Sequence, residues 1–238
     1  MNNSNDSKYI VYNYTFEYSN SEKHEFLIEL DKKSLSLISR KKKSYPNWTK
    51  LINFKCSNCP LEIEKHNYCP LAINLIDVLK VFKNEISFEN VNLTVKTNDR
   101  KILIKTTFQD GLSSLLGLYM ATSGCPILGK LKPMVKLHTP VPTLDETIIK
   151  SISVYLLAQL FIKKQGKKPD WDLKNLVKIY QEIQIVNRCV IDKISSHIEK
   201  DASLNALVIL NNFADFIPFS INLDELDEIE NVFSAYFD

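Results

Sequence analysis

The cysteines of this 238-residue chain are the feature that most constrains its fold. Cys56 and Cys59 are separated by two residues, Cys69 follows ten residues later, and Cys125 lies far downstream. The last three of these are each followed by a proline. Because proline suits the first position of a helix, the pattern predicts that each of the three lies at or near a helix N-cap. Free N–H groups and the helix dipole at such a position lower the pKa of a thiol toward thiolate.

This spacing of thiolates predicts a metal site, and two sets of four ligands remain open. One set is Cys56, Cys59, Cys69 and Cys125, and the other replaces Cys125 by His66. Tetrahedral zinc accepts sulfur and imidazole, so both sets suit a structural zinc ion. An iron–sulfur cluster favours the set of four cysteines, and a redox dithiol built from the same cysteines is a third alternative.

The fifth cysteine has a different setting. Cys189 lies among Ile185, Val186 and Val190 in a segment with helical periodicity. A free cysteine in such a stretch behaves as a small buried hydrophobe. We therefore expect Cys189 to be inert and dispensable for metal binding.

Composition and charge limit the class of partner. The net charge is only +2, which argues against a general affinity for nucleic acid or for an anionic membrane. The basic run Arg40 to Lys43 lies beside Tyr45 and Trp48, but such a run is more typical of a solvated loop than of a nucleic-acid site. No stretch reaches eighteen apolar residues, so no membrane partner is expected, whereas a protein partner remains open.

The start of the chain is polar and lacks the apolar core of a signal peptide. Five cysteines without such a signal are typical of reduced thiols, so we expect a cytoplasmic protein. The chain has neither a phosphate-loop motif nor a His-Glu-x-x-His motif, and nothing in it names a substrate or decides whether it is an enzyme.

The hydrophobic periodicity predicts an α+β fold, with an N-terminal antiparallel β-sheet, a cysteine knuckle and a C-terminal helical bundle. Residues 9–18 and 24–30 alternate like two strands around a turn, and residues 34–38 predict a third strand. Residues 92–97 and 102–108 predict a second hairpin.

Helical spacing predicts two helices beside the cysteines, over Pro70–Phe82 and over about Leu112–Ser123. On the second of these, Ser114, Gly117 and Ala121 share one face. A face of such small residues allows another backbone, or a flat ligand, to approach closely.

The second half of the chain predicts a helical region. Thr143 to Glu146 fits a capping box that opens a helix running to about Lys164. Pro169 predicts the start of the next helix, which runs to about Glu199, and a further helix begins at Asp201 or Ser203 and is stopped by Pro218. Prolines near residue 140 predict a boundary between residues 1–140 and 141–238, although one integrated domain is the alternative.

Several motifs resemble an uncharacterised family of bacterial proteins, a domain of unknown function. The resemblance covers about Lys55 to Phe216, and it implies a bacterial source but no activity or ligand. The matching segments are Cys56-Ser-Asn-Cys-Pro-Leu, His66-Asn-Tyr-Cys-Pro, Thr122-Ser-Gly-Cys-Pro, Pro169-Asp-Trp-Asp-Leu and Lys200-Asp-Ala-Ser-Leu-Asn-Ala-Leu-Val. Because the resemblance names no ligand, the thiolate spacing is the basis of our expectation. We expect a soluble protein with a structural zinc site that acts as a binding or accessory protein, with an iron–sulfur or thiol redox or sensor protein as the alternative.

Overall fold

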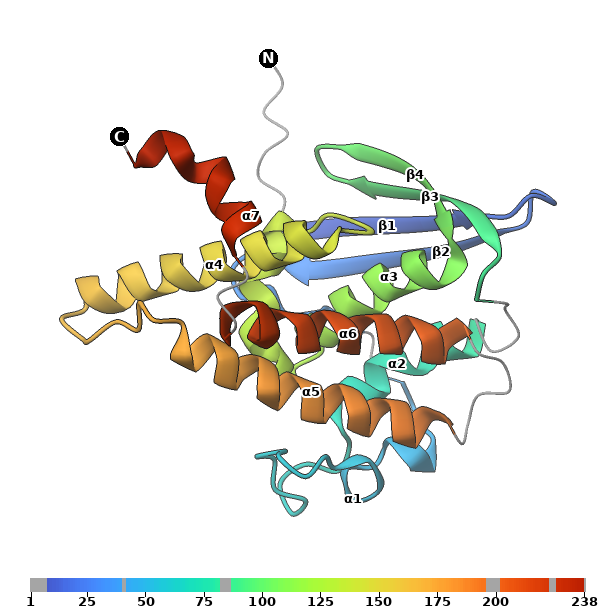
Figure 1. Ribbon diagram of the computed structural model, residues 1–238. Coiled ribbons are helices and arrows are strands. Elements are labelled where there is room, and N and C mark those ends of the chain that lie inside the picture. Colours follow the sequence, from blue (N-terminus) through green and yellow to red (C-terminus); the bar gives the residue numbers. More distant parts are fainter. Residues whose placement is uncertain (1–7, 40–41, 82–86, 196–201, 223–225, 238) are drawn as a thin grey trace.

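The protein has an α+β fold in the computed structural model, which describes residues 8–39, 42–81, 87–195, 202–222 and 226–237 (Figure 1). A four-stranded antiparallel sheet comes from the first half of the chain, and the second half is helical, as the sequence predicts. The strands are β1 (Tyr9–Glu17), β2 (Lys23–Asp31), β3 (Asn90–Thr97) and β4 (Lys101–Thr107). The α-helices are α1 (Leu51–Phe54), α2 (Pro70–Val81), α3 (Phe108–Thr122), α4 (Leu144–Lys164), α5 (Lys174–Ser195), α6 (Ala202–Asn222) and α7 (Asp227–Glu230). The 3-10 helices are η1 (Asn47–Thr49), η2 (Leu128–Leu137) and η3 (Asn231–Tyr236).

The sheet has the strand order β2-β1-β3-β4, so both predicted hairpins are present and they pair with each other through β1 and β3. Its alternating side chains give the sheet one apolar face. Tyr14 pairs with Phe26 on one side and with Val95 on the other, and all three are buried. This face carries the core of the N-terminal half.

The predicted third strand over residues 34–38 is wrong, because this segment turns back on itself. Asp31 accepts hydrogen bonds from the backbone N–H groups of Lys33 and Ser34, at 3.1 and 2.8 Å. Leu35 then adopts a φ of 53°. A single isolated bridge between Leu30 and Leu37 is the only ladder contact of this segment within the described residues. The side-chain turn at Asp31 therefore prevails over the period-two pattern.

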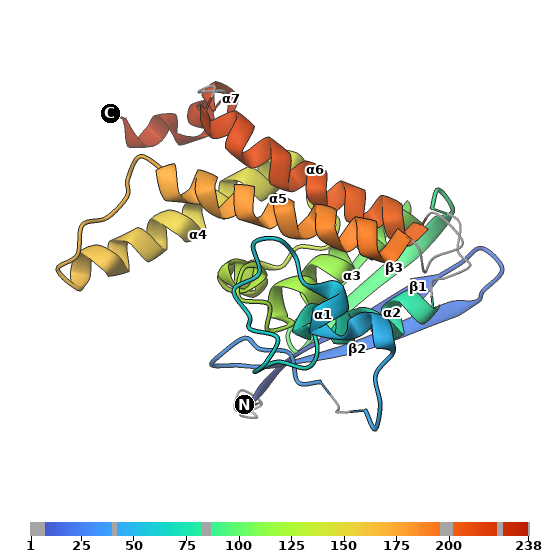
Figure 2. The same cartoon turned by 90° about the horizontal axis from the view of Figure 1, so that it is seen from below.

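The helices cover the apolar face of the sheet in layers (Figure 2). Helix α3 lies directly on the sheet, and Gly111 permits this approach, since a Cβ atom there would lie 2.9 Å from Cε1 of Phe16. Helices α2 and α6 pack on α3, and α5 packs along α6. Buried side chains from both halves, such as Leu116, Val186 and Leu207, belong to one hydrophobic core.

The predicted capping box of α4 is confirmed, but the predicted start of the next helix is wrong. Thr143 and Glu146 exchange both hydrogen bonds of the box. Helix α5 begins at Lys174 rather than near Pro169, because Leu173 has a φ of 59° and cannot belong to a helix. The carboxylate of Asp170 accepts the Asn175 N–H at 2.7 Å and so stabilises this delayed start.

The sequence predicts that Pro218 stops a helix, and this prediction is wrong, because Pro218 lies inside α6. Proline removes the hydrogen bond to the carbonyl four residues earlier, which belongs to Ala214. The side-chain amide of Gln184, on α5, donates to this carbonyl oxygen at 3.0 Å. Tertiary packing thus compensates for the missing backbone donor and allows the helix to continue.

Helix α6 is also the one helix in the described part of the chain that is long and apolar enough to cross a membrane by length and composition. Residues Ala202–Ile221 have a mean hydropathy of 1.4, and a third of this segment is buried inside the fold. Contacts with α3 and α5 account for that burial.

Candidate thiol site

Two cysteines lie in the loop that follows α1, and a third closes this loop. Cys56 is buried, and the backbone N–H of Cys59 donates to its carbonyl at 3.0 Å. Cys69 is also buried, and its N–H donates to the carbonyl of Thr49 at 2.9 Å. The chain between residues 49 and 69 therefore forms a closed loop beneath the helices, visible around α1 in Figure 1.

Two of the three cysteine–proline pairs occupy the predicted kind of position. Cys69 directly precedes α2, and its sulfur accepts the N–H groups of Leu71 and Ala72. Cys125 comes just before η2, and its sulfur accepts the N–H groups of Ile127 and Leu128. The prediction is wrong for Cys59, because the chain turns after Pro60 and no helix begins there.

The loops that carry Cys69 and Cys125 are held side by side. The side-chain amide of Asn74 donates to the carbonyls of Pro70 and Ser123, at 2.8 and 3.2 Å, and thereby bridges the two loops. Gly124 has a φ of 94°, which favours glycine, and a Cβ atom at this position would lie 3.5 Å from Cβ of Pro70. These contacts bring cysteines that are 56 positions apart to the same end of α2 and α3.

Helix α5 brings the fifth cysteine to the same place. Cys189 forms a side-chain hydrogen bond with Cys56. Two further contacts dock α5 on the cysteine loop: Asn58 donates to the carbonyl of Glu182 at 3.0 Å, and Lys193 donates to the carbonyl of Asn53 at 2.7 Å. The expectation that Cys189 is simply a buried hydrophobe is therefore wrong, because it is only partly buried and contacts Cys56.

Electrostatic interactions connect all five thiols. Cys56 interacts with Cys69, Cys125 and Cys189, while Cys59 interacts with Cys69 and Cys125. We call this group the cysteine cluster. Nothing local in the sequence points from Cys189 to the other four, since no other cysteine lies near it along the chain. Only the docking of α5 reveals it.

Burial reverses the predicted direction of the pKa shift at Cys69 and Cys125. Desolvation raises the pKa of Cys69 to about 11 and also raises that of Cys125, although backbone N–H groups at both sulfurs oppose the shift. The hydrogen bond with Cys189, followed by burial, raises the pKa of Cys56. The same hydrogen bond lowers the pKa of Cys189. Of the four thiols whose pKa is shifted, only Cys189, which sequence patterns miss, is shifted toward thiolate.

His66, the alternative fourth ligand, lies on the surface of the loop. It is exposed, and its backbone N–H donates to the Glu62 carbonyl at 3.0 Å. It is not among the groups whose charges shift the pKa values of Cys56, Cys69 or Cys125. Among the described residues, no three His, Cys, Asp or Glu side chains are arranged to hold a metal ion.

The basic run falls partly outside the described residues, to which Arg40 and Lys41 do not belong. The Lys42 ammonium forms an ion pair with the Asp77 carboxylate. This pairing leaves Lys42 less available to a phosphate backbone.

Comparison with other proteins gives one assignment. No curated protein and no solved structure matches this chain. One family model matches residues 10–234, which is nearly the whole length and includes all five cysteines. The chain therefore belongs to the family described as Domain of unknown function (DUF6901).

Proposed function

We propose that this protein binds a structural zinc ion through thiolates and acts by binding rather than by catalysis. The proposed ligands are Cys56, Cys59, Cys69 and Cys125. The observation that carries the proposal is the convergence of cysteines from separate parts of the chain in one cluster. Zinc prefers four such ligands in structural sites.

Metal binding would have to draw the sulfur atoms closer together than they lie now. It would also have to displace thiol protons, because burial holds the pKa of Cys69 at about 11. The loop residues that carry Cys56 and Cys59 belong to no strand or long helix, so they can make this adjustment at small cost.

The direct test is elemental analysis of protein purified without oxygen. We expect about one zinc ion per chain, the stoichiometry of a single four-ligand site. Alanine substitution of Cys56, Cys59, Cys69 or Cys125 should each reduce the zinc content strongly. The matched controls are Cys189→Ala and His66→Ala.

Each control decides a specific point. Loss of zinc in His66→Ala with retention in Cys125→Ala would establish the local set of ligands. Loss in Cys189→Ala would make that thiol a ligand. Wild-type protein that neither contains nor takes up zinc would refute the proposal.

A second candidate is a thiol redox protein, which the contact between Cys56 and Cys189 favours. Oxidation would join their sulfurs in a disulfide and transfer two electrons and two protons to an oxidant, such as a small disulfide. Mass spectrometry after treatment with oxidised glutathione would detect this bond. If the same cysteines hold an iron–sulfur cluster instead, the protein purified without oxygen will be brown and contain iron.

We also propose a source and a cellular compartment for this protein. Thiol ligands stay reduced in a bacterial cytoplasm, and we propose that environment for this chain. The proposed partner of the site is then the metal itself, which stabilises the loop against the helices.

A further inference from the structure

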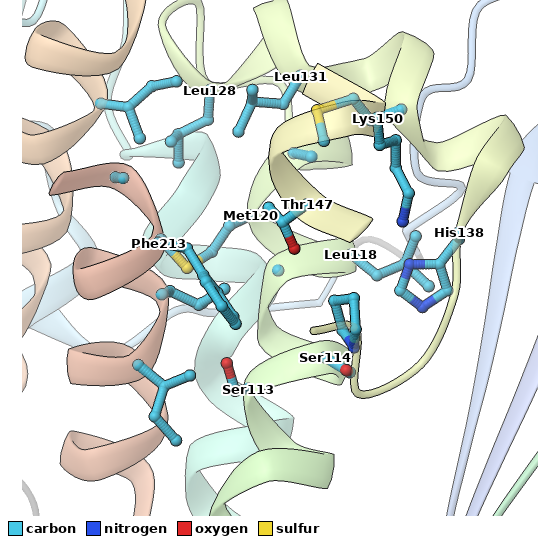
Figure 3. Close-up of a pocket in the computed structure, with 18 of the residues that line it drawn as sticks. Ser113, Ser114, Leu118, Met120, Leu128, Leu131, His138, Thr147, Lys150 and Phe213 are labelled. Atoms are coloured by element: carbon cyan, nitrogen blue, oxygen red, sulfur yellow. The ribbon is translucent and has the colours of Figure 1, made fainter. Parts of the chain in front are cut away.

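A second region of the molecule contains a partly open cavity that the cysteine cluster does not use. A cavity of about 190 Å³ lies among α3, η2, α4, α5 and α6 (Figure 3). Its walls are mostly apolar, and Phe213 lies across the pocket from His138 in this view. Other apolar wall residues are Met120, Leu128, Leu131 and Met134. We call this space the inner cavity. An apolar cavity of about 150 Å³ is already large enough to bind benzene.

The inner cavity adjoins a wider cleft at one end. His138, Thr139 and Lys150 line both spaces, so they lie at the boundary between them. The cleft has a volume of about 750 Å³ and four cationic side chains, against the two carboxylates of Asp99 and Glu146. The four are Lys32, Arg100, Lys136 and Lys150. We call this space the basic cleft.

Lys150 is the cation at this boundary. Its ammonium donates to the Thr139 hydroxyl at 3.3 Å, and Figure 3 shows its side chain running toward His138. In the part of the chain that the structure describes, no carboxylate forms an ion pair with it. Glu146, one turn earlier on α4, interacts with it electrostatically but is engaged in the capping box.

We propose that the inner cavity and the basic cleft together bind a small carboxylate with an apolar body of about six to eight carbon atoms. The apolar body would occupy the inner cavity, and the carboxylate would contact the Lys150 ammonium at the boundary with the basic cleft. Both halves of this ligand match the chemistry that faces them.

The state of Lys150 supports this placement. Partial burial lowers its pKa, which means that its charged form has lost favourable hydration. A carboxylate would restore a partner to this ammonium through a charge-assisted hydrogen bond. His138 cannot supply that charge, since burial lowers its pKa to about 3 and leaves the ring neutral.

The methionines allow a direct test, because the chain has only three. Met120 and Met134 line the inner cavity, and Met1 is remote in sequence and serves as an internal reference. Protein labelled with ¹³C at the methionine methyl groups is titrated with octanoate and followed by NMR. We expect saturable shifts of the Met120 and Met134 signals and an unchanged Met1 signal.

Matched probes separate the two halves of the ligand. Acetate has the charge without the apolar body and should shift neither methionine signal. Hexanoate should bind about fourfold more weakly than octanoate for each methylene that it lacks. The uncharged 1-octanol should bind, but at least about tenfold more weakly than octanoate, because it lacks the charge-assisted contact.

Variants then locate the charge. Lys150→Met should weaken octanoate at least about tenfold and leave 1-octanol unchanged. Lys163→Met removes a cation from the exposed end of the same helix and should change neither affinity. Ala121→Leu reduces the inner cavity and should weaken both probes.

Two results would overturn the proposal. One is the absence of octanoate-dependent shifts at Met120 and Met134 in the folded wild-type protein. The other is an octanoate affinity that Lys150→Met leaves unchanged, since the cavity would then take apolar molecules irrespective of charge. Neither result depends on Ala121→Leu being able to fold.

Discussion

The cysteine cluster and the inner cavity both combine residues from distant parts of the chain, but they are stabilised differently. The cluster is carried by short loops whose positions depend on single contacts, such as the Asn74 amide that bridges two carbonyls. Regular helices form most of the inner cavity, and its shape follows from their packing. The cluster can therefore rearrange locally, whereas the cavity can change only if helices or large side chains move.

The largest expected difference between the two regions is in the unfolding free energy lost when an apolar side chain beside each region is replaced by alanine. Leu75 of α2 is fully buried behind the cysteine cluster, and Leu75→Ala should cost about 2–5 kcal/mol of unfolding free energy. Leu131→Ala should cost clearly less, since Leu131 already faces empty space and has fewer packing partners to lose. Urea denaturation measures both, and the exposed Leu157 gives a control whose alanine variant should be nearly neutral. Equal costs for Leu75 and Leu131 would mean that the cavity wall is packed as tightly as the core.

Acid should lower the free energy of unfolding through His138, which lies beside the inner cavity. Burial, and to a smaller extent the Lys150 charge, lowers the pKa of His138 from 6.5 to about 3. Between these values the unfolded chain binds the extra proton, so this stability is present in full above pH 6.5 and declines as the pH falls. The slope should reach up to about 1.4 kcal/mol per pH unit.

His138→Gln should remove the pH-dependent contribution that His138 makes to the free energy of unfolding. The measurement is the free energy of unfolding between pH 7 and about pH 4 for both proteins, because only their difference reports on His138. Parallel curves would contradict the burial of a neutral imidazole at this position. The contact between His138 and the Tyr14 hydroxyl is the interaction at risk.

Two glycines of α3 should respond to alanine in opposite directions. At Gly111 a Cβ atom would lie 2.9 Å from Phe16, which is fully buried, so Gly111→Ala should cost about 1–3 kcal/mol. At Gly117 it would lie 3.2 Å from Leu210, which borders the inner cavity and has room to move. Gly117→Ala should therefore stabilise α3 by up to about 1 kcal/mol. Melting temperatures that fall equally for both variants would show that Leu210 cannot yield.

A smaller cost than at Gly111 is expected in the loop before Cys125. Gly124→Ala should cost about 1–2 kcal/mol, because the φ of 94° is strained for a residue with a side chain. Gly129→Ala is the matched control, since its Cβ atom would meet only Lys132 at 3.9 Å. Comparable unfolding free energies for the two variants would argue that the Cys125 loop relaxes freely.

Local signals in the sequence predict the elements that depend on local contacts. The hairpins, α2 and the capping box of α4 follow from alternation, helical spacing and side-chain caps. The continuation of α6 through Pro218 could not be predicted, because it depends on the amide of Gln184 from another helix. The delayed start of α5 depends on Leu173, whose positive φ leaves no sequence signature.

The sequence likewise predicts only those parts of the candidate site that depend on local contacts. The spacing of Cys56, Cys59 and Cys69 suggests proximity, and the N-cap position of Cys69 follows from Pro70. Cys189 could not be predicted to join them, since its apolar neighbours indicate only a buried helix face. The inner cavity depends on gaps between side chains of several helices, and no sequence pattern specifies such a gap.

The most direct test of a structural zinc ion at the cysteine cluster is amide hydrogen exchange. It is measured on zinc-loaded protein before and after a chelator removes the metal. If a structural zinc ion holds the cysteine loop, chelation should increase exchange first at residues 56–70 and near Cys125. Residues 154–160 of α4 should remain protected, because they depend on helix packing rather than on the metal. Unchanged exchange around the cysteines would contradict a structural zinc site and would favour thiol redox chemistry at the same cluster.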